Sequence, residues 1–152
     1  MYSRQYTAPC CPLRLDFDDA DRLTGLHWQH QPMPWLTTLS GHWAAQLDAY
    51  FSGSLKAFDY PVSAQGTAFQ QRVWQAIASI PYGQVASYGD IAKLIGSAPR
   101  AVGQACGKNP LPIVVPCHRV VASHGLGGFG LGNNESDLAI KKWLLAHEGA
   151  QW

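Results

Sequence analysis

Apolar and polar residues follow different periods in the two parts of the chain. Residues 1–60 alternate in short runs between turn-forming residues, which predicts strands over 1–7, 13–17 and 22–28 joined as antiparallel hairpins. A helix ending at Gly53 is predicted next. Its apolar stripe would consist of Leu36, Leu39, Trp43, Leu47 and Tyr50.

From Thr67 onward the apolar residues recur at helical spacing. Thr67 is a typical N-cap, and the helix that it opens is predicted to stop at 81–83, where Pro and Gly occur. Two short helices follow, over 87–96 and over 99–109. Two short helices joined by a tight turn containing glycine are a helix-turn-helix pattern.

The last predicted helix is amphipathic, with Ser136 or Asp137 as its cap and Gly149 as its closing residue. The change of period near residues 60–66 predicts two parts and an α+β fold class. Residues 1–62 would form a small antiparallel β-sheet lobe with a helix. Residues 63–152 would form a mainly helical, winged helix-turn-helix-like lobe that carries the active site.

Composition narrows the class of protein only a little. The chain has 152 residues, 47% of them hydrophobic, which is enough to build a core, and its formal net charge is +1. Residues 84–121 hold four Lys/Arg and one acid. This basic segment can face phosphates or can simply be solvated, and charge alone favours the solvated face.

The chain has four cysteines and no run that approaches the roughly 18–20 apolar residues of a membrane span. Its N-terminus is polar and lacks the apolar core of a secretory signal. We therefore expect a reduced, cytoplasmic protein without membrane attachment. In that compartment, a cysteine in an unusual setting is more often chemical than structural.

Cys117 has such a setting, because it stands in the most hydrophobic segment between Pro116 and two basic residues, His118 and Arg119. A buried cysteine is ordinarily an inert small hydrophobe, which suits Cys106 on its predicted helix. Pro116 disfavours a central strand, and unpaired basic residues are costly to bury. The chain is therefore predicted to bend at Cys117 and to present it at a lobe boundary. The imidazole would lower the pKa of the thiol.

An imidazole that accepts a thiol proton needs a third group to orient it, usually a carboxylate. The acids that follow Asp90 are Glu135, Asp137 and Glu148. Glu148 falls in the final turn of a helix whose apolar residues pack inward, so it could lie inside the protein. A Cys–His–Glu relay is a hypothesis that the residues allow.

Four motifs occur in order along the second part of the chain. They are "TAFQQRVWQAIASIPYGQVASYGDIA" (67–92), "RAVGQACGKNP" (100–110), "PCHRVV" (116–121) and "KKWLLAHEG" (141–149). Together they resemble the O6-alkylguanine-DNA alkyltransferase (methylated-DNA–protein-cysteine methyltransferase) family over about residues 60–150.

The resemblance implies a single-turnover DNA repair protein. Such a protein flips an alkylated guanine out of double-stranded DNA and moves the alkyl group from O6 irreversibly to its own cysteine. O4-methylthymine is a second candidate substrate. The family likeness implies minor-groove binding by a monomer and no cofactor. No metal is expected either, because Cys10, Cys11, His27 and His30 do not have the spacing of a zinc site.

The resemblance also implies roles for five residues of the reaction centre. Cys117 would attack the alkyl carbon, and His118 would take the thiol proton through a water. Glu148 would orient His118. Tyr88 would supply a proton near the departing base, and Asn109 would hold the turn between the recognition helix and the active site.

Further residues are implied to contact DNA or the alkylated base. Arg100 would fill the space that the extruded base leaves, since an Arg side chain can occupy a base stack. The minor groove is only about 6 Å wide, so a helix that enters it needs a face of small residues. Small residues suit close helix packing equally well. The DNA-contacting set is Arg100, Ala98, Ala101, Gly103, Lys108 and Tyr88. The pocket set is Val120, Val121, Pro112, Phe129, Gly130 and Leu131.

Residues 126–137 depart from the family pattern, because Phe129, Gly130 and Leu131 replace its usual residues and several residues are inserted after them. Substrate range and rate are the properties that this departure would change. Two other functions are compatible with the residues. One is a non-catalytic sensor that binds alkylated bases, and the other is a thiol hydrolase that turns over repeatedly.

Overall fold

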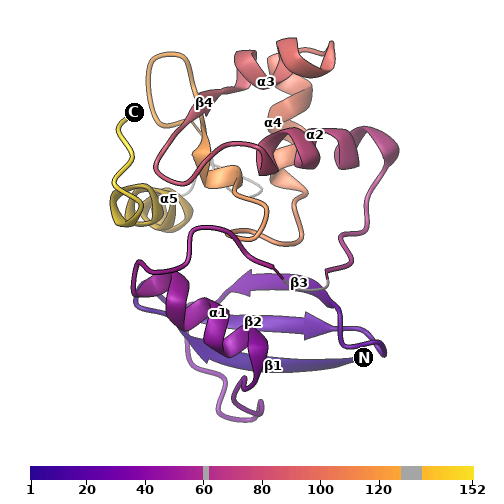
Figure 1. Ribbon diagram of the computed structural model, residues 1–152, viewed down its shortest axis with the longest axis vertical. Helices are drawn as coiled ribbons and strands as arrows, with labels where there is room; N and C mark the ends of the chain where they lie inside the picture. Colours follow the sequence, from indigo (N-terminus) through magenta and orange to yellow (C-terminus); the bar gives the residue numbers. More distant parts are fainter. Residues whose placement is uncertain (60–61, 128–134) are drawn as a thin grey trace. The chain divides into compact units, whose positions relative to one another are not determined.

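The computed structural model describes residues 1–59, 62–127 and 135–152, in two compact units, Met1–Gln65 and Gly66–Trp152 (Figure 1). The fold is α+β, as predicted: a small antiparallel sheet with a helix, then a mainly helical unit. No helix in the described parts of the chain combines the length and apolar character that crossing a membrane requires. The predicted division of roles between 1–62 and 63–152 stays a prediction.

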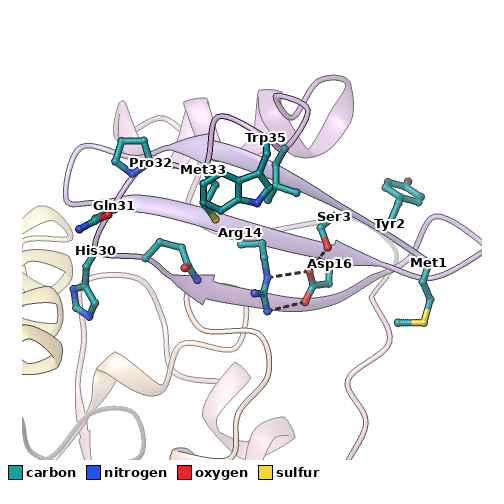
Figure 2. Close-up of a pocket in the computed structure, with 12 residues that line it drawn as sticks. Met1, Tyr2, Ser3, Arg14, Asp16, His30, Gln31, Pro32, Met33 and Trp35 are labelled. Carbon is teal, nitrogen blue, oxygen red and sulfur yellow. Dashed lines mark hydrogen bonds and ion pairs between the residues drawn. The ribbon is translucent and has the colours of Figure 1, made fainter.

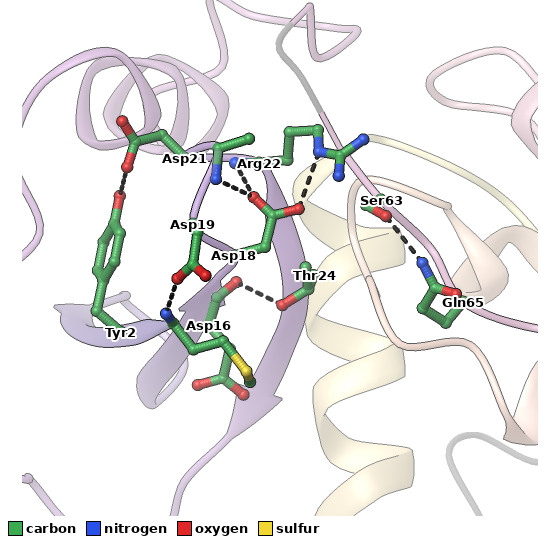
Figure 3. Close-up of polar contacts among 11 residues, drawn as sticks. Tyr2, Asp16, Asp18, Asp19, Asp21, Arg22, Thr24, Ser63 and Gln65 are labelled. Atoms are coloured by element: carbon green, nitrogen blue, oxygen red, sulfur yellow. Dashed lines mark hydrogen bonds and ion pairs between the residues drawn. The ribbon is translucent and has the colours of Figure 1, made fainter.

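The first unit contains the predicted hairpins. Strands β1 (Tyr2–Thr7), β2 (Pro12–Phe17) and β3 (Leu23–Trp28) pair antiparallel in that order. The predicted alternation of buried and exposed side chains is seen in β2, where every second side chain is buried. The β2–β3 turn is closed by Asp18, whose Oδ1 accepts the backbone N–H of Arg22 at 3.0 Å, as Figure 3 shows.

The helix of this unit, α1 (His42–Phe51), is shorter than predicted. Leu36 and Leu39 lie outside it. The Leu36 N–H closes a turn on the Met33 carbonyl at 3.0 Å, and the residues that follow run beside β1, where the Leu39 N–H donates to the Gln5 carbonyl at 2.7 Å. Leu39 is buried and Leu36 half-buried, so apolar residues at helical spacing occur here without a helix. Gly41, with φ 80°, precedes the helix. In Figure 1, α1 lies along one face of the sheet, and its buried residues are Trp43, Leu47 and Tyr50.

The second unit opens with the predicted capped helices. The first, α2 (Ala68–Ala78), starts in a capping box made by Thr67, and α3 (Tyr88–Ile95) starts in one made by Ser87. Helix α4 (Pro99–Gly107) follows and has Pro at its first position. The Trp74 indole of α2 donates to the Ala105 carbonyl of α4 at 2.9 Å, which fixes the two helices to each other.

Two further elements complete this unit. Strand β4 (Ala86–Ser87) pairs in parallel with β5 (Val120–Val121), a contact that the sequence did not predict. The last helix, α5, spans Glu135–His147. The predicted cap at Ser136 or Asp137 is therefore wrong, since both residues lie inside the first turn. A carboxylate there still suits the positive end of the helix dipole.

Candidate active site

The cysteine that the sequence singles out lies at a sharp bend. Cys117 begins the short 3-10 helix η1 (Cys117–Arg119), in which the Arg119 N–H donates to the Pro116 carbonyl at 2.9 Å. The cysteine is 5% exposed. Pro116, which lacks a backbone donor, thus sits where the apolar run turns instead of continuing as a strand.

Asn109 braces this bend from the segment that follows α4. Its Nδ2 donates to the Val115 carbonyl at 2.9 Å and lies 3.2 Å from the Cys117 sulfur. Its Oδ1 accepts the Leu111 N–H at 2.9 Å. One amide side chain therefore ties the sulfur to the backbone on both sides of the loop that precedes it.

A buried charge cluster follows the cysteine immediately. The Nε2 atom of His118 lies 2.7 Å from Oε2 of Glu148. Arg119 donates two hydrogen bonds to the same carboxylate, from Nε to Oε1 at 2.8 Å and from Nη2 to Oε2 at 3.1 Å. Its Nη1 donates to the Ile80 carbonyl at 2.8 Å. His118 and Glu148 have fully buried side chains. The carboxylate is compensated by Arg119, which makes its burial tolerable.

The state of His118 follows from this cluster. Burial lowers the pKa of its imidazole despite the raising effect of Glu148, so the ring is neutral at pH 7. The bond to the carboxylate assigns the ring proton to Nε2 and leaves a lone pair on Nδ1. Nδ1 is buried and has no hydrogen-bond partner within the described ranges. Its lone pair makes this nitrogen a base.

The expectation that His118 lowers the pKa of the thiol is wrong. A hydrogen bond with the Cys106 side chain and burial raise the pKa of Cys117 well above its ordinary value, although Asn109 and Lys141 act in the opposite direction. A neutral imidazole held by Glu148 offers the sulfur no positive charge. The resting residue is a thiol that must lose its proton before it can react.

Tyr88 lies at the start of α3, half-buried, close to two glycines. A Cβ added to Gly103 would be 3.9 Å from the Tyr88 ring, and one added to Gly127 only 2.9 Å from it. The Lys141 ammonium lies 5.8 Å from the ring centroid. The ring thus occupies a narrow slot between α4, the segment after β5, and α5.

The residues predicted to contact DNA are distributed along α4 and its flanks. Ala98, Arg100 and Lys108 are exposed, and Ala101 and Gly103 are half-buried. The buried face of α4 is formed by Val102 and Ala105 instead. Close helix packing therefore explains Ala105 but not the exposed Ala98.

The predicted pocket residues fall into two groups. Val120 and Val121 are buried on β5, and Pro112 is half-buried beside the bend. Phe129, Gly130 and Leu131 lie outside the described residues.

Residues 68–150 match the model of the 6-O-methylguanine DNA methyltransferase, DNA binding domain. This chain belongs to that family. The matched residues make up more than half of the chain. The resemblance inferred from the motifs is thereby confirmed.

Individual relatives agree. The methylated-DNA–protein-cysteine methyltransferase of Methanosarcina acetivorans is 50% identical over 108 residues, 69% of this chain and 66% of that protein. The Archaeoglobus fulgidus protein of the same name is 41% identical over 76% of this chain and 80% of its own length. The match to the Mycobacterium tuberculosis protein spans only 56% of that relative. The crystal structure of Mycobacterium tuberculosis OGT in complex with DNA has a TM-score of 0.83, with 40% identity over 98% of this chain and 93% of that chain.

Sequence reasoning missed two residues of this methyltransferase-family site. Arg119 was noted only as costly to bury, yet it is the charge partner of Glu148. Lys141 was not considered, although its side chain is fully buried and its Nζ donates to the Val120 carbonyl at 2.7 Å. A signal was present, because Lys141 shares a helix face with Leu144 and Leu145, which are three and four positions on.

The first unit, Met1–Gln65, contains a pocket of about 750 Å³ beside β2 (Figure 2). Arg14 and Asp16 line it and pair with each other at 3.2 Å. His27, one of the imagined zinc ligands, is bonded to Asp16 at 2.9 Å. Across the described ranges, no three His, Cys, Asp or Glu side chains cluster as metal ligands would.

Proposed function

We propose that this chain repairs DNA by moving the alkyl group of O6-alkylguanine irreversibly to Cys117. The observation that carries the proposal is the site itself: a thiol followed directly by a neutral, buried imidazole that a carboxylate orients. The family membership and the relatives' names support the same reaction. O4-methylthymine is a further proposed substrate.

The proposed reaction uses the chain's own groups. Nδ1 of His118 takes the thiol proton through a water, and Glu148, 2.7 Å from Nε2, stabilises the imidazolium that forms. The sulfur forms a bond to the alkyl carbon while the carbon–O6 bond breaks, and the electron pair leaves with the guanine. Tyr88 supplies the proton that neutralises the base. The Asn109 amide, 3.2 Å from the sulfur, stabilises the thiolate.

The proposed mode of DNA binding places α4 in the minor groove. Exposed Arg100 would occupy the space of the flipped base, and the small side chains at 98, 101 and 103 would admit the helix to the groove. Lys108 would contact phosphate. Flipping is required because O6 is inaccessible to a protein sulfur inside the stacked duplex, and it costs a few kcal/mol. The protein is proposed to act as a monomer.

The deciding experiment is intact-protein mass spectrometry after incubation with duplex DNA that carries O6-methylguanine. The proposal expects a gain of one methylene group, located on Cys117, at one equivalent per protein. Cys117→Ala should abolish the gain and still bind DNA, while Cys10→Ala, a thiol of the other unit, should behave as the wild type. DNA binding without any mass gain would instead identify a lesion sensor. Repeated turnover of a thioester or ester would identify a hydrolase.

The flipping role of Arg100 needs a separate test. Arg100→Ala should slow transfer from duplex DNA strongly but leave reaction with free O6-benzylguanine nearly unchanged, since the free base needs no flipping. Lys142→Ala, which removes an exposed charge from α5, is the matched control and should change neither rate much. Equal losses on both substrates would refute the role.

A further inference from the structure

The pocket beside β2 has no part in the proposed alkyl transfer. Its volume, about 750 Å³, lies within the range of roughly 300–1,000 Å³ that is usual for the sites of small ligands. Trp35 lines the pocket, and its side chain is 77% exposed. An aromatic ring that keeps a face open beside a pocket is suited to stacking on a planar ligand.

Trp35 stands at the corner of a fixed turn. The Leu36 N–H donates to the Met33 carbonyl at 3.0 Å, which closes the turn around Trp35, and Met33 is buried beneath it. Gln5 of β1 ties down the far side. Its Nε2 donates to the Leu36 carbonyl at 2.7 Å, and its backbone N–H donates to the Thr37 carbonyl at 2.9 Å. This wall of the pocket is therefore already ordered before a ligand binds, which favours binding.

Arg14 of β2 lines the same pocket, with its side chain 40% exposed and its orientation fixed by Asp16 (Figure 2). Nε and Nη2 of Arg14 lie 3.2 Å and 3.5 Å from the two carboxylate oxygens. Ser3 and His27 hold the same carboxylate, at 2.6 Å and 2.9 Å. In the described part of the chain, Nη1 of Arg14 makes no hydrogen bond. The outer edge of the guanidinium, Nη1 with Nη2, is thus a pair of donors open to a ligand.

We propose that this pocket binds a guanine base, which stacks on Trp35 and accepts hydrogen bonds at O6 and N7 from the outer edge of Arg14. Guanine presents these two acceptors side by side, and a two-bond contact with Arg is its commonest specific contact in proteins. Adenine places an amino donor beside its N7, so one N–H of Arg14 would face another donor. The pair of bonds therefore selects guanine, and the stack adds affinity for any base.

Asp16 disfavours an anion, such as phosphate, on the same edge of Arg14. Burial raises the pKa of Asp16, but Ser3, Arg14 and His27 outweigh this effect, so the pKa lies below its ordinary value and the group is a carboxylate at pH 7. A second anion on this guanidinium would be repelled by the first. A neutral base meets no such repulsion and still finds both donors. Two sources of guanine fit, a free nucleotide and an unpaired guanine in DNA.

The first test titrates the whole chain with deoxyguanosine monophosphate (dGMP) in a calorimeter. We expect saturable binding, with the adenine nucleotide dAMP at least about fivefold weaker. Trp35→Leu should weaken dGMP binding at least about fivefold, because the stack is lost. Arg14→Gln should bind dGMP no better than dAMP. The matched controls are Trp152→Leu, an exposed tryptophan of the other unit, and Arg22→Gln, which breaks an exposed ion pair with Asp18; both should bind dGMP as the wild type does.

The second test distinguishes the two sources. Oligothymidine with one central guanine should bind more tightly than oligothymidine alone, and Trp35→Leu should abolish this difference. Binding of dGMP without the difference assigns the pocket to free nucleotides, and the difference without dGMP binding assigns it to unpaired DNA. Absence of both overturns the inference. So does Trp35→Leu that equals the wild type with every guanine ligand.

This inference and the proposed function fail separately. Cys117→Ala should bind dGMP as the wild type does, and Trp35→Leu should still gain one methylene from methylated duplex DNA. A chain that binds guanine but gains no methylene refutes alkyl transfer alone. A chain that gains the methylene but binds neither dGMP nor the guanine of the oligonucleotide refutes the guanine site alone.

Discussion

Removing the Arg119 side chain, as in Arg119→Met, tests whether the buried charge cluster holds the second unit together. The Arg119 side chain is 7% exposed and that of Glu148 is fully buried. The guanidinium makes two hydrogen bonds to the carboxylate and one to the Ile80 carbonyl. Methionine fills much of the same space but leaves the carboxylate without its cation.

The size of the effect follows from burial. Breaking a buried ion pair by removing one partner costs about 3–5 kcal/mol, because an uncompensated charge remains inside. This is a large part of the roughly 5–15 kcal/mol by which domains are stable. With a urea m-value of about 2 kcal/mol/M, the unfolding midpoint should fall by about 1.5–2.5 M.

The assay is urea unfolding of the whole chain, followed by tryptophan fluorescence. The matched control is Arg72→Met, since Arg72 is exposed and makes one bond to the Ile95 carbonyl; its cost should stay below about 1 kcal/mol. The double variant Arg119→Met/Glu148→Gln should cost less than the sum of its single changes by at least about 1 kcal/mol, since no charge is then left unpaired. Arg119→Met with the midpoint of Arg72→Met, or strict additivity, would refute the reasoning.

Three further predictions concern single residues of the second unit. Burial lowers the pKa of Lys141 from 10.5 to about 8. Between these pH values the unfolded chain binds more protons than the folded chain, so the free energy of unfolding should rise with pH. Urea unfolding across this window should show a flatter rise for Lys141→Met than for the wild type. Gly127→Ala forces a Cβ to within 2.9 Å of Tyr88 at φ +74°, and should lose about 1–3 kcal/mol and transfer alkyl groups more slowly, whereas Gly125→Ala, with open space around it, should change neither measurement. Thr67→Ala removes the capping box and should lower the free energy of unfolding by about 1 kcal/mol, whereas Thr67→Ser should keep the stability of the wild type. An unchanged urea midpoint in Thr67→Ala would contradict this prediction.

Local patterns predicted the elements well wherever the cause was local. Alternation predicted β2 because each apolar side chain of that strand faces the same side. The caps at Thr67 and Ser87 were predictable because a cap bonds a backbone N–H only three residues away. Leu36 and Leu39 misled for the opposite reason. Apolar spacing reports burial, and here Leu36 lies in a turn while Leu39 is buried on a segment that is hydrogen-bonded to Gln5, far back in the chain.

The candidate site divides in the same way. The motif around Cys117 identified the family and the residue order, and the Cys–His–Glu hypothesis named the partner that the structure places 2.7 Å from His118. The sign of the pKa shift at Cys117 was missed, because it depends on the burial of the thiol and on Cys106, and neither is visible in the local sequence.

The amino-acid sequence by itself determined the α+β class, the capped helices and the family, because each depends on residues within a few positions of one another or on motifs in order. Tertiary structure decided which buried charges meet. Arg119 and Glu148 are separated by 29 positions, and Lys141 and Val120 by 21. Their pairing depends on where α5 packs, and burial makes that pairing obligatory, since a charge without a partner inside the protein costs several kcal/mol.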